Sequence, residues 1–160
     1  MSDEQQTDAK KTPRRLAREL AMQGLYQWRM TGNSVEAIAE HLEKESENWL
    51  RADRPLAMVL LHGAVTHAET LETEFAPHLD RPIGEISPIE RAILLLGTYE
   101  LTHRLETPYR VVINEAIELS KSFGGTDGHR YVNGVLDKLA PRLRKAEVEA
   151  AARMKAKKDA

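Results

Sequence analysis

Three arginines near the N-terminus are the residues of this sequence whose type and spacing best suit a chemical task. Arg18 follows Arg14 by four positions and Arg15 by three, so all three can point to one side of a helix. Guanidinium groups at this spacing can hold successive phosphates of a nucleic acid. Lys10 and Lys11 extend the positive charge toward the N-terminus. The competing interpretation is a solvated helix face, and helix propensity alone does not separate the two.

Recognition of bases requires stacking or hydrogen-bonding groups in addition to cations. Two pairs of an aromatic and a basic residue, Tyr109-Arg110 and Arg130-Tyr131, stand at expected helix starts. Each tyrosine could instead be a core ring with its hydroxyl at the surface. Spacing alone leaves both interpretations open.

Other kinds of chemistry find little support in the sequence. The chain has no cysteine, and among its six histidines His62 and His67 are five positions apart, so no pair has the i+3 or i+4 spacing of metal ligands on a helix. There is no glycine-rich phosphate loop followed by Lys-Ser/Thr, and the glycines of segment 124–128 are better explained by a turn between helices. We therefore expect no catalytic residue, no metal and no cofactor.

Charges are segregated along the chain, although the net charge is only −2. Segment 10–29 carries six bases and one acid, segment 30–107 carries fourteen acids and six bases, and segment 108–160 carries eleven bases and seven acids. Two basic ends therefore flank an acidic middle. A polyanion could be held by the ends, while the middle could meet a cationic partner.

Helix signals account for most of the chain, and the sequence predicts an all-α protein. A first helix is expected from Thr12-Pro13 to about Gly32. The flank away from its apolar face is expected to carry Arg15, Arg18, Met22 and Arg29. Apolar spacing from Pro55 onward predicts one long helix that ends near Pro77.

Ser87-Pro88-Ile89-Glu90 has the pattern of a capping box, and the helix after it is apolar on nearly all sides, as a central buried helix should be. We expect three parts: a disordered lead-in over 1–11, one helical domain over 12–143 and a basic tail over 144–160. The polar N-terminus and the lack of a long apolar run favour a cytoplasmic protein without a membrane partner.

Six blocks of sequence follow one another along the chain: RRLARELA at 14–21, GLYQW at 24–28, IERAIL at 89–94, PYRVVINEAIEL at 108–119, KSFG at 121–124 and YVNGVLDK at 131–138. Together these blocks resemble the NusB family of transcription antitermination factors. The resemblance covers most of the chain. It implies an all-helical fold of about seven helices in two small subdomains.

The resemblance also implies a function. Family members bind boxA-type single-stranded RNA of ribosomal RNA leader transcripts together with the ribosomal protein NusE. The pair joins an elongating RNA polymerase complex that resists termination, which supports ribosomal RNA transcription and ribosome biogenesis. The implied RNA-binding residues are Arg14, Arg15, Arg18, Tyr109, Arg110, Asp127 and Tyr131. The implied contacts for the ribosomal protein are Tyr26 and Glu90.

Two other functions compete with this prediction. A NusB-like domain also occurs fused to an RNA cytosine methyltransferase, but here only a short basic tail follows the helical part. A helical adaptor that binds only protein could use the acidic middle for a basic partner, with the arginines serving solubility. The oligomeric state stays open between a monomer and a homodimer.

Overall fold

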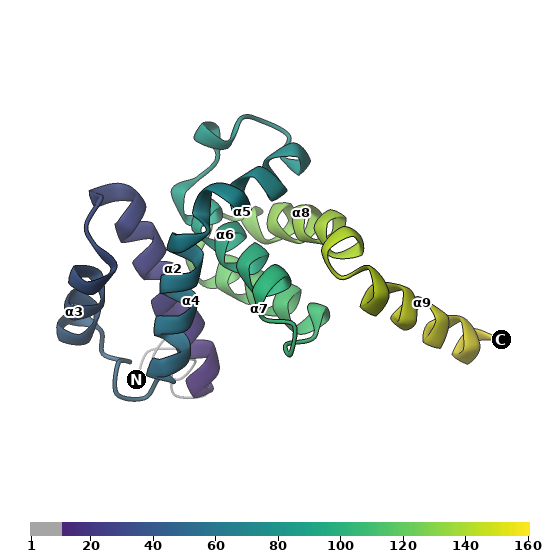
Figure 1. Ribbon diagram of the computed structural model, residues 1–160, viewed down its shortest axis with the longest axis horizontal. Helices are drawn as coiled ribbons and strands as arrows, with labels where there is room; N and C mark the ends of the chain where they lie inside the picture. Colours follow the sequence, from purple (N-terminus) through teal and green to yellow (C-terminus); the bar gives the residue numbers. More distant parts are fainter. Residues whose placement is uncertain (1–10) are drawn as a thin grey trace. The chain divides into compact units, whose positions relative to one another are not determined.

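The computed structural model describes residues 11–160, so nearly all of the expected lead-in, residues 1–10, lies outside the described residues. Eight α-helices and two short 3-10 turns make up the described part, which contains no strand (Figure 1). The helices are α2 (Pro13–Thr31), α3 (Val35–Glu45), α4 (Arg54–Thr66), α5 (Ala68–Phe75), α6 (Pro88–His103), α7 (Tyr109–Phe123), α8 (Gly128–Leu143) and α9 (Lys145–Asp159). The 3-10 turns are η1 (Ala76–His78) and η2 (Ile83–Glu85).

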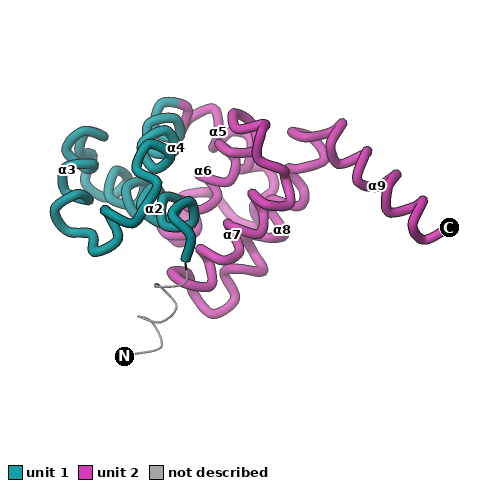
Figure 2. Tube along the Cα trace, turned by 90° about the horizontal axis from the view of Figure 1, so that it is seen from below, with its two compact units in different colours: residues 1–66 teal, residues 67–160 magenta. Residues whose placement is uncertain are grey.

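The chain divides into two compact units, Met1–Thr66 and His67–Ala160, called unit 1 and unit 2 below (Figure 2). The expected all-α fold of two small helical subdomains is confirmed, with eight helices between residues 11 and 160 where about seven were predicted.

Unit 1 is built around α2, which packs against α3 and α4. Thr12 caps the start of α2, where its Oγ1 accepts a hydrogen bond of 3.1 Å from the Arg15 amide. Gly32 ends the helix in the left-handed conformation, with φ of 73°, which glycine adopts without a Cβ clash. A close approach also requires Gly24, because a Cβ there would lie 3.0 Å from both terminal methyl carbons of Leu61 on α4.

The flank expected to lie away from the apolar face of α2 was predicted wrongly in part: Arg15 and Arg29 are partly exposed, but its other two members are not. Met22 is fully buried and Arg18 is 3 % exposed, and both lie in a stretch from Leu16 to Leu25 in which nearly every residue is buried. Spacing locates the apolar residues of a helix, but it does not reveal whether other parts of the chain cover the polar flank as well. Packing on several sides of α2 therefore overrode the prediction.

The long helix predicted from Pro55 to Pro77 is two helices. α4 ends at Thr66, and His67, with φ of −105° and ψ of 15°, separates it from α5. The apolar spacing continues through Ala64, Ala68 and Leu71, all of which are buried, so the break leaves no mark in the pattern. The boundary between the two compact units falls at the same place.

Unit 2 has α6 at its centre, as the sequence predicts. Ser87 Oγ accepts a hydrogen bond of 3.3 Å from the Glu90 amide, and every residue from Ala92 to Leu101 is buried. Helices α5, α7 and α8 all contact α6. Close packing of α8 depends on Gly97, where a Cβ would lie 3.2 Å from a methyl carbon of Leu136.

Helix α9 contacts α8, runs away from the rest of unit 2 and buries none of its own residues (Figures 1 and 2). None of the helices between residues 11 and 160 combines the length and apolarity that crossing a membrane requires.

Candidate nucleic-acid interface

The arginine cluster occupies the first two turns of α2 in unit 1. Arg14 is exposed, Arg15 is partly exposed and Arg18 is buried. Arg15 and Arg18 both have interaction partners within the protein. Lys11 is also engaged, because its Nζ lies 2.6 Å from Glu19 Oε1 and both side chains are nearly buried. Arg14 is therefore the member of the cluster that a phosphate could reach most directly.

Tyr109 and Arg110 form the first turn of α7 in unit 2. Pro108 precedes them and supplies no side-chain cap, so the first amide groups of the helix need other acceptors. The Tyr109 amide donates a hydrogen bond of 2.9 Å to Glu147 Oε1 on α9. The Arg110 guanidinium carbon lies 5.5 Å from the centre of the Tyr109 ring. An aromatic face and a cation thus stand side by side at an anchored helix start.

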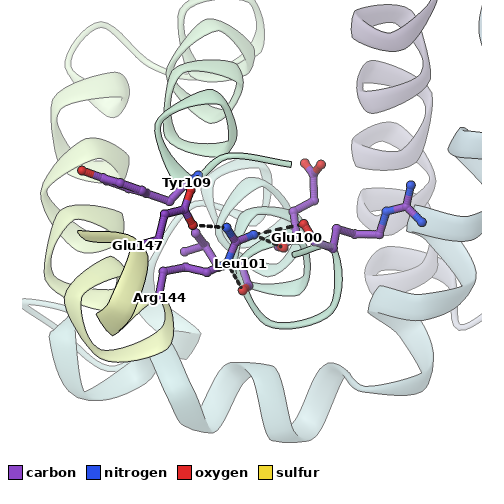
Figure 3. A network of polar contacts seen from close by, with 6 residues as sticks. Glu100, Leu101, Tyr109, Arg144 and Glu147 are labelled. Atoms are coloured by element: carbon purple, nitrogen blue, oxygen red, sulfur yellow. Dashed lines mark hydrogen bonds and ion pairs between the residues drawn. The ribbon is translucent and has the colours of Figure 1, made fainter. Parts of the chain in front are cut away.

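A buried arginine holds this helix start in place (Figure 3). Arg144, at the junction of α8 and α9, donates from Nε to the Leu101 carbonyl at 2.7 Å and from Nη2 to the carbonyls of Glu100 at 3.1 Å and Arg104 at 3.0 Å. Its Nη1 lies 2.6 Å from Glu147 Oε2. Arg144 therefore caps the C-terminal end of α6, while Glu147 caps the N-terminal end of α7.

This pair changes the interpretation of the expected basic tail, 144–160. Arg144 is 5 % exposed, and Glu147 connects it to the Tyr109 amide. The first residues of the tail therefore belong to the folded body of unit 2, whereas the last turns of α9 are exposed.

Asp127 stands at the N-cap position of α8, and its side chain makes no capping hydrogen bond. Aspartate is among the best N-cap residues, so an exposed Asp127 that does not cap is available to a ligand. The carboxylate of Glu90 lies at this helix end, since a Cβ on Gly128 would be only 2.7 Å from Glu90 Oε1. A negative charge near a helix N-terminus is favourable, and Glu90 supplies it here.

Tyr131 lies one turn into α8, beside the segment that joins α5 to α6. The guanidinium carbon of Arg81 lies 5.3 Å from the centre of its ring. Arg81 also forms two hydrogen bonds with Asp80, of 2.8 and 3.3 Å, and these lower the pKa of the Asp80 carboxyl. Burial raises the pKa of the Tyr131 hydroxyl, which has no hydrogen bond of normal geometry among the described residues. The hydroxyl therefore stays protonated at neutral pH.

The two units each contain part of the predicted set. Unit 1 holds Arg14, Arg15, Arg18 and Tyr26, and unit 2 holds Tyr109, Arg110, Asp127, Tyr131 and Glu90. Within unit 2, the structure brings Tyr109 next to Arg110 and places Glu90 at the start of the helix that carries Asp127 and Tyr131. Tyr26 is partly exposed on α2, about two turns beyond Arg18.

Three residues of the site were not predicted from the sequence: Arg81, Arg144 and Glu147. Arg144 and Glu147 have the i,i+3 spacing of a helix ion pair, but that spacing is common on solvated helices and does not reveal burial. Arg81 stands in a connector without periodicity. Only the folded chain brings these residues to Tyr109 and Tyr131.

The fold and the positions of the site residues define the class of protein. It is an all-helical protein of two small units, in which polar, aromatic and basic side chains lie at helix starts. The NusB family model matches residues 15–141. The transcription antitermination protein NusB of Azoarcus sp. (strain BH72) is 62 % identical over 147 residues, covering 92 % of this chain and 93 % of that protein. The chain belongs to the NusB family.

Solved structures agree with this assignment. A NusB structure from T. maritima has a TM-score of 0.71 and 29 % sequence identity, covering 81 % of this chain and 92 % of that one. A crystal structure of the antitermination factors NusB and NusE with double-stranded RNA has a TM-score of 0.70 and 28 % identity, covering 78 % of this chain and 93 % of that one.

Proposed function

We propose that this protein is an antitermination factor that binds boxA-type single-stranded RNA of ribosomal RNA leader transcripts together with the ribosomal protein NusE. The complex joins an elongating RNA polymerase and keeps it processive on ribosomal RNA operons in the cytoplasm. The observation that carries the proposal is the family match over residues 15–141, which includes nearly all the predicted site residues. A solved relative that holds NusE and RNA supports the choice of partners.

The proposed RNA-binding residues have different roles, which follow from the chemistry of their side chains. Arg14 and Arg15 supply phosphate contacts from α2, and Arg18 supports that turn from its buried position. Tyr109 and Tyr131 offer ring faces for bases, Arg110 adds a cation, and the Asp127 carboxylate accepts hydrogen bonds from base amino groups. The residues proposed to contact NusE are Tyr26 and Glu90.

Fluorescence anisotropy with a boxA RNA and a scrambled RNA, each with and without NusE, tests the proposal. We expect tighter binding of boxA RNA in the presence of NusE, with affinity falling steeply as salt rises. Binding that ignores both sequence and NusE would contradict the proposal. No binding of RNA at all, with NusE still bound, would favour the protein-only adaptor.

Arg14 is the sharpest single position for this test, because it is exposed and its replacement should leave the fold intact. Arg14→Ala is expected to reduce the slope of log K against log salt by about 0.7, the value for one phosphate contact on a single strand. Lys44→Ala is the matched control: Lys44 is an exposed cation of the same unit, paired with Glu40 on α3. If the two variants have equal slopes of log K against log salt, Arg14 does not contact an RNA phosphate.

We propose no catalytic step and no cofactor for this protein. The methyltransferase alternative makes a separate prediction, namely that the protein binds S-adenosylmethionine. Isothermal titration with that compound distinguishes the two, and measurable binding would contradict the purely RNA-binding function.

A further inference from the structure

A groove between α7 and α8, in unit 2, begins at the two residues that open α7. Its volume is about 330 Å³, at the small end of the range for ligand pockets. The lining residues are Tyr109, Arg110, Ile113, Asn114, Ile117, Asn133 and Asp137. Only Tyr109 and Arg110 of this set belong to the RNA-binding residues proposed above.

The groove combines an apolar surface with polar groups that have no partner of their own. Ile113, which is buried, and Ile117, which is partly exposed, supply the apolar part. Asn114 on α7 and Asn133 and Asp137 on α8 supply the polar part, and none of these three side chains has a hydrogen bond or ion pair with another described residue. Polar groups therefore form the larger part of the lining, and the two isoleucines form a smaller apolar part.

We infer that this groove receives one unpaired nucleobase of the bound RNA, an inference that rests on the proposed function. The apolar part of the lining suits a flat face of a base, and the two asparagine amides can both donate to and accept from its edge. The Asp137 carboxylate only accepts hydrogen bonds, so it selects a base with an amino or imino N–H on the edge that it meets.

The charges of the groove favour a base over a phosphate as its occupant. Asp137 would repel a phosphate placed among the lining residues. Arg110 is exposed, and its guanidinium lies beside the Tyr109 ring at the start of α7. A nucleotide would therefore place its base in the groove and its phosphate against Arg110.

The test couples variants of the groove to single abasic substitutions in the RNA. A boxA oligonucleotide is made with each nucleotide in turn replaced by an abasic one, and affinities are measured in the presence of NusE for the wild-type protein, Asn133→Ala and Asp137→Asn. Both side chains are at least partly exposed and lack partners, so these variants should keep the fold, which circular dichroism verifies.

We expect each groove variant to weaken binding of the intact RNA about tenfold. At one RNA position only, replacing the nucleotide with an abasic one should cause almost no further loss of affinity in the groove variants. The base at that position is the one that the groove holds, and the variants have already lost its contacts. Glu85→Gln is the control for the charge change of Asp137→Asn, since Glu85 is an exposed acid of the same unit outside the groove. At every RNA position, the abasic substitution should reduce the affinity of this control variant as much as it reduces the affinity of the wild type.

Three results would overturn the inference. If the groove variants bind like the wild type while Arg14→Ala still shows its reduced salt dependence, the proposed function stands and the groove is not a base site. If the variants bind every abasic RNA more weakly than the wild type does, and by the same factor, the groove acts on the fold or on NusE and not on one base. A wild-type protein that fails to bind boxA RNA even with NusE would overturn the proposed function as well.

Discussion

Replacing Arg144 with alanine is expected to destabilise unit 2 by about 3–5 kcal/mol, somewhat less than the sum of the three charged hydrogen bonds that it makes to backbone carbonyls. The side chain of Arg144 is 4 % exposed and is paired with Glu147, whose side chain is 36 % exposed. It also donates to three backbone carbonyls at the end of α6, and hydrogen bonds from charged groups contribute about 1.5–3 kcal/mol each. Water can satisfy some of these carbonyls once the arginine is gone, so the contributions do not simply add.

The readout must report on unit 2. Both tryptophans, Trp28 and Trp49, lie in unit 1, so intrinsic tryptophan fluorescence would follow the wrong unit. Urea unfolding followed by circular dichroism at 222 nm, together with hydrogen exchange of the Tyr109 amide, follows the affected helices. The Tyr109 amide donates to Glu147, and we expect it to exchange faster in the variant.

Arg142→Ala is the matched control, two positions earlier in the chain. Arg142 pairs with Glu74, but its side chain is 57 % exposed, and pairs of this kind contribute about 0–1 kcal/mol. If the two variants lose equal stability, or if Arg144→Ala unfolds at the same urea concentration as the wild type, the reasoning from burial and carbonyl capping is refuted.

Three further predictions concern packing, the tail and pH. Gly24→Ala should destabilise unit 1 by about 1–3 kcal/mol in urea unfolding followed by tryptophan fluorescence, because its Cβ would press on Leu61. Gly134→Ala, on the exposed face of α8, should instead stabilise unit 2 by about 0.5–1 kcal/mol. The opposite order of stabilities would contradict the packing described for Gly24. Deleting 151–160 should leave the thermal unfolding midpoint unchanged, because these residues are not buried, and a clear fall would show that they stabilise the fold. Burial lowers the pKa of His103 below its usual value of 6.5, so the unfolded chain takes up the proton at higher pH than the folded one. Stability should therefore fall as pH drops through about 6.5, and His103→Gln should show a smaller difference in midpoint between pH 5.5 and 8; an unchanged difference would exclude His103 as a cause.

Helix starts were predictable because their signals are local. Thr12 before Pro13 and Ser87 before Pro88 place a hydroxyl at the N-cap and a proline at the first helical position, and both cap bonds form in the structure. The buried centre of α6 was equally clear, since a helix that is apolar on all sides must be covered.

The break between α4 and α5 could not be predicted from spacing. Ala64 and Ala68 keep the helical period across His67, so the period alone cannot show where one helix ends and the next begins. Tertiary packing decides that point.

The candidate site was predicted residue by residue from the family resemblance, but the accessibility of its members was not. Arg14 and Arg18 are the same residue type on the same helix, yet one is exposed and the other is buried. A buried arginine and a solvated one look alike in a single sequence. The groove beyond Tyr109 was missed for a related reason, because Asn114 and Asn133 come from two helices that meet only after folding.

Glu90 and Gly128 connect the two kinds of site that the proposed function assigns to unit 2. Glu90 is the proposed contact for NusE, and its carboxylate lies at the helix end next to Asp127, a proposed RNA contact that does not cap the helix itself. If a cationic group of NusE paired with Glu90, the favourable charge at that helix end would weaken, and Asp127, at the N-cap position, could replace it. Occupancy of one site would then alter the free energy of binding at the other. By thermodynamic linkage the effect is mutual: the factor by which NusE changes the affinity for RNA is the factor by which RNA changes the affinity for NusE.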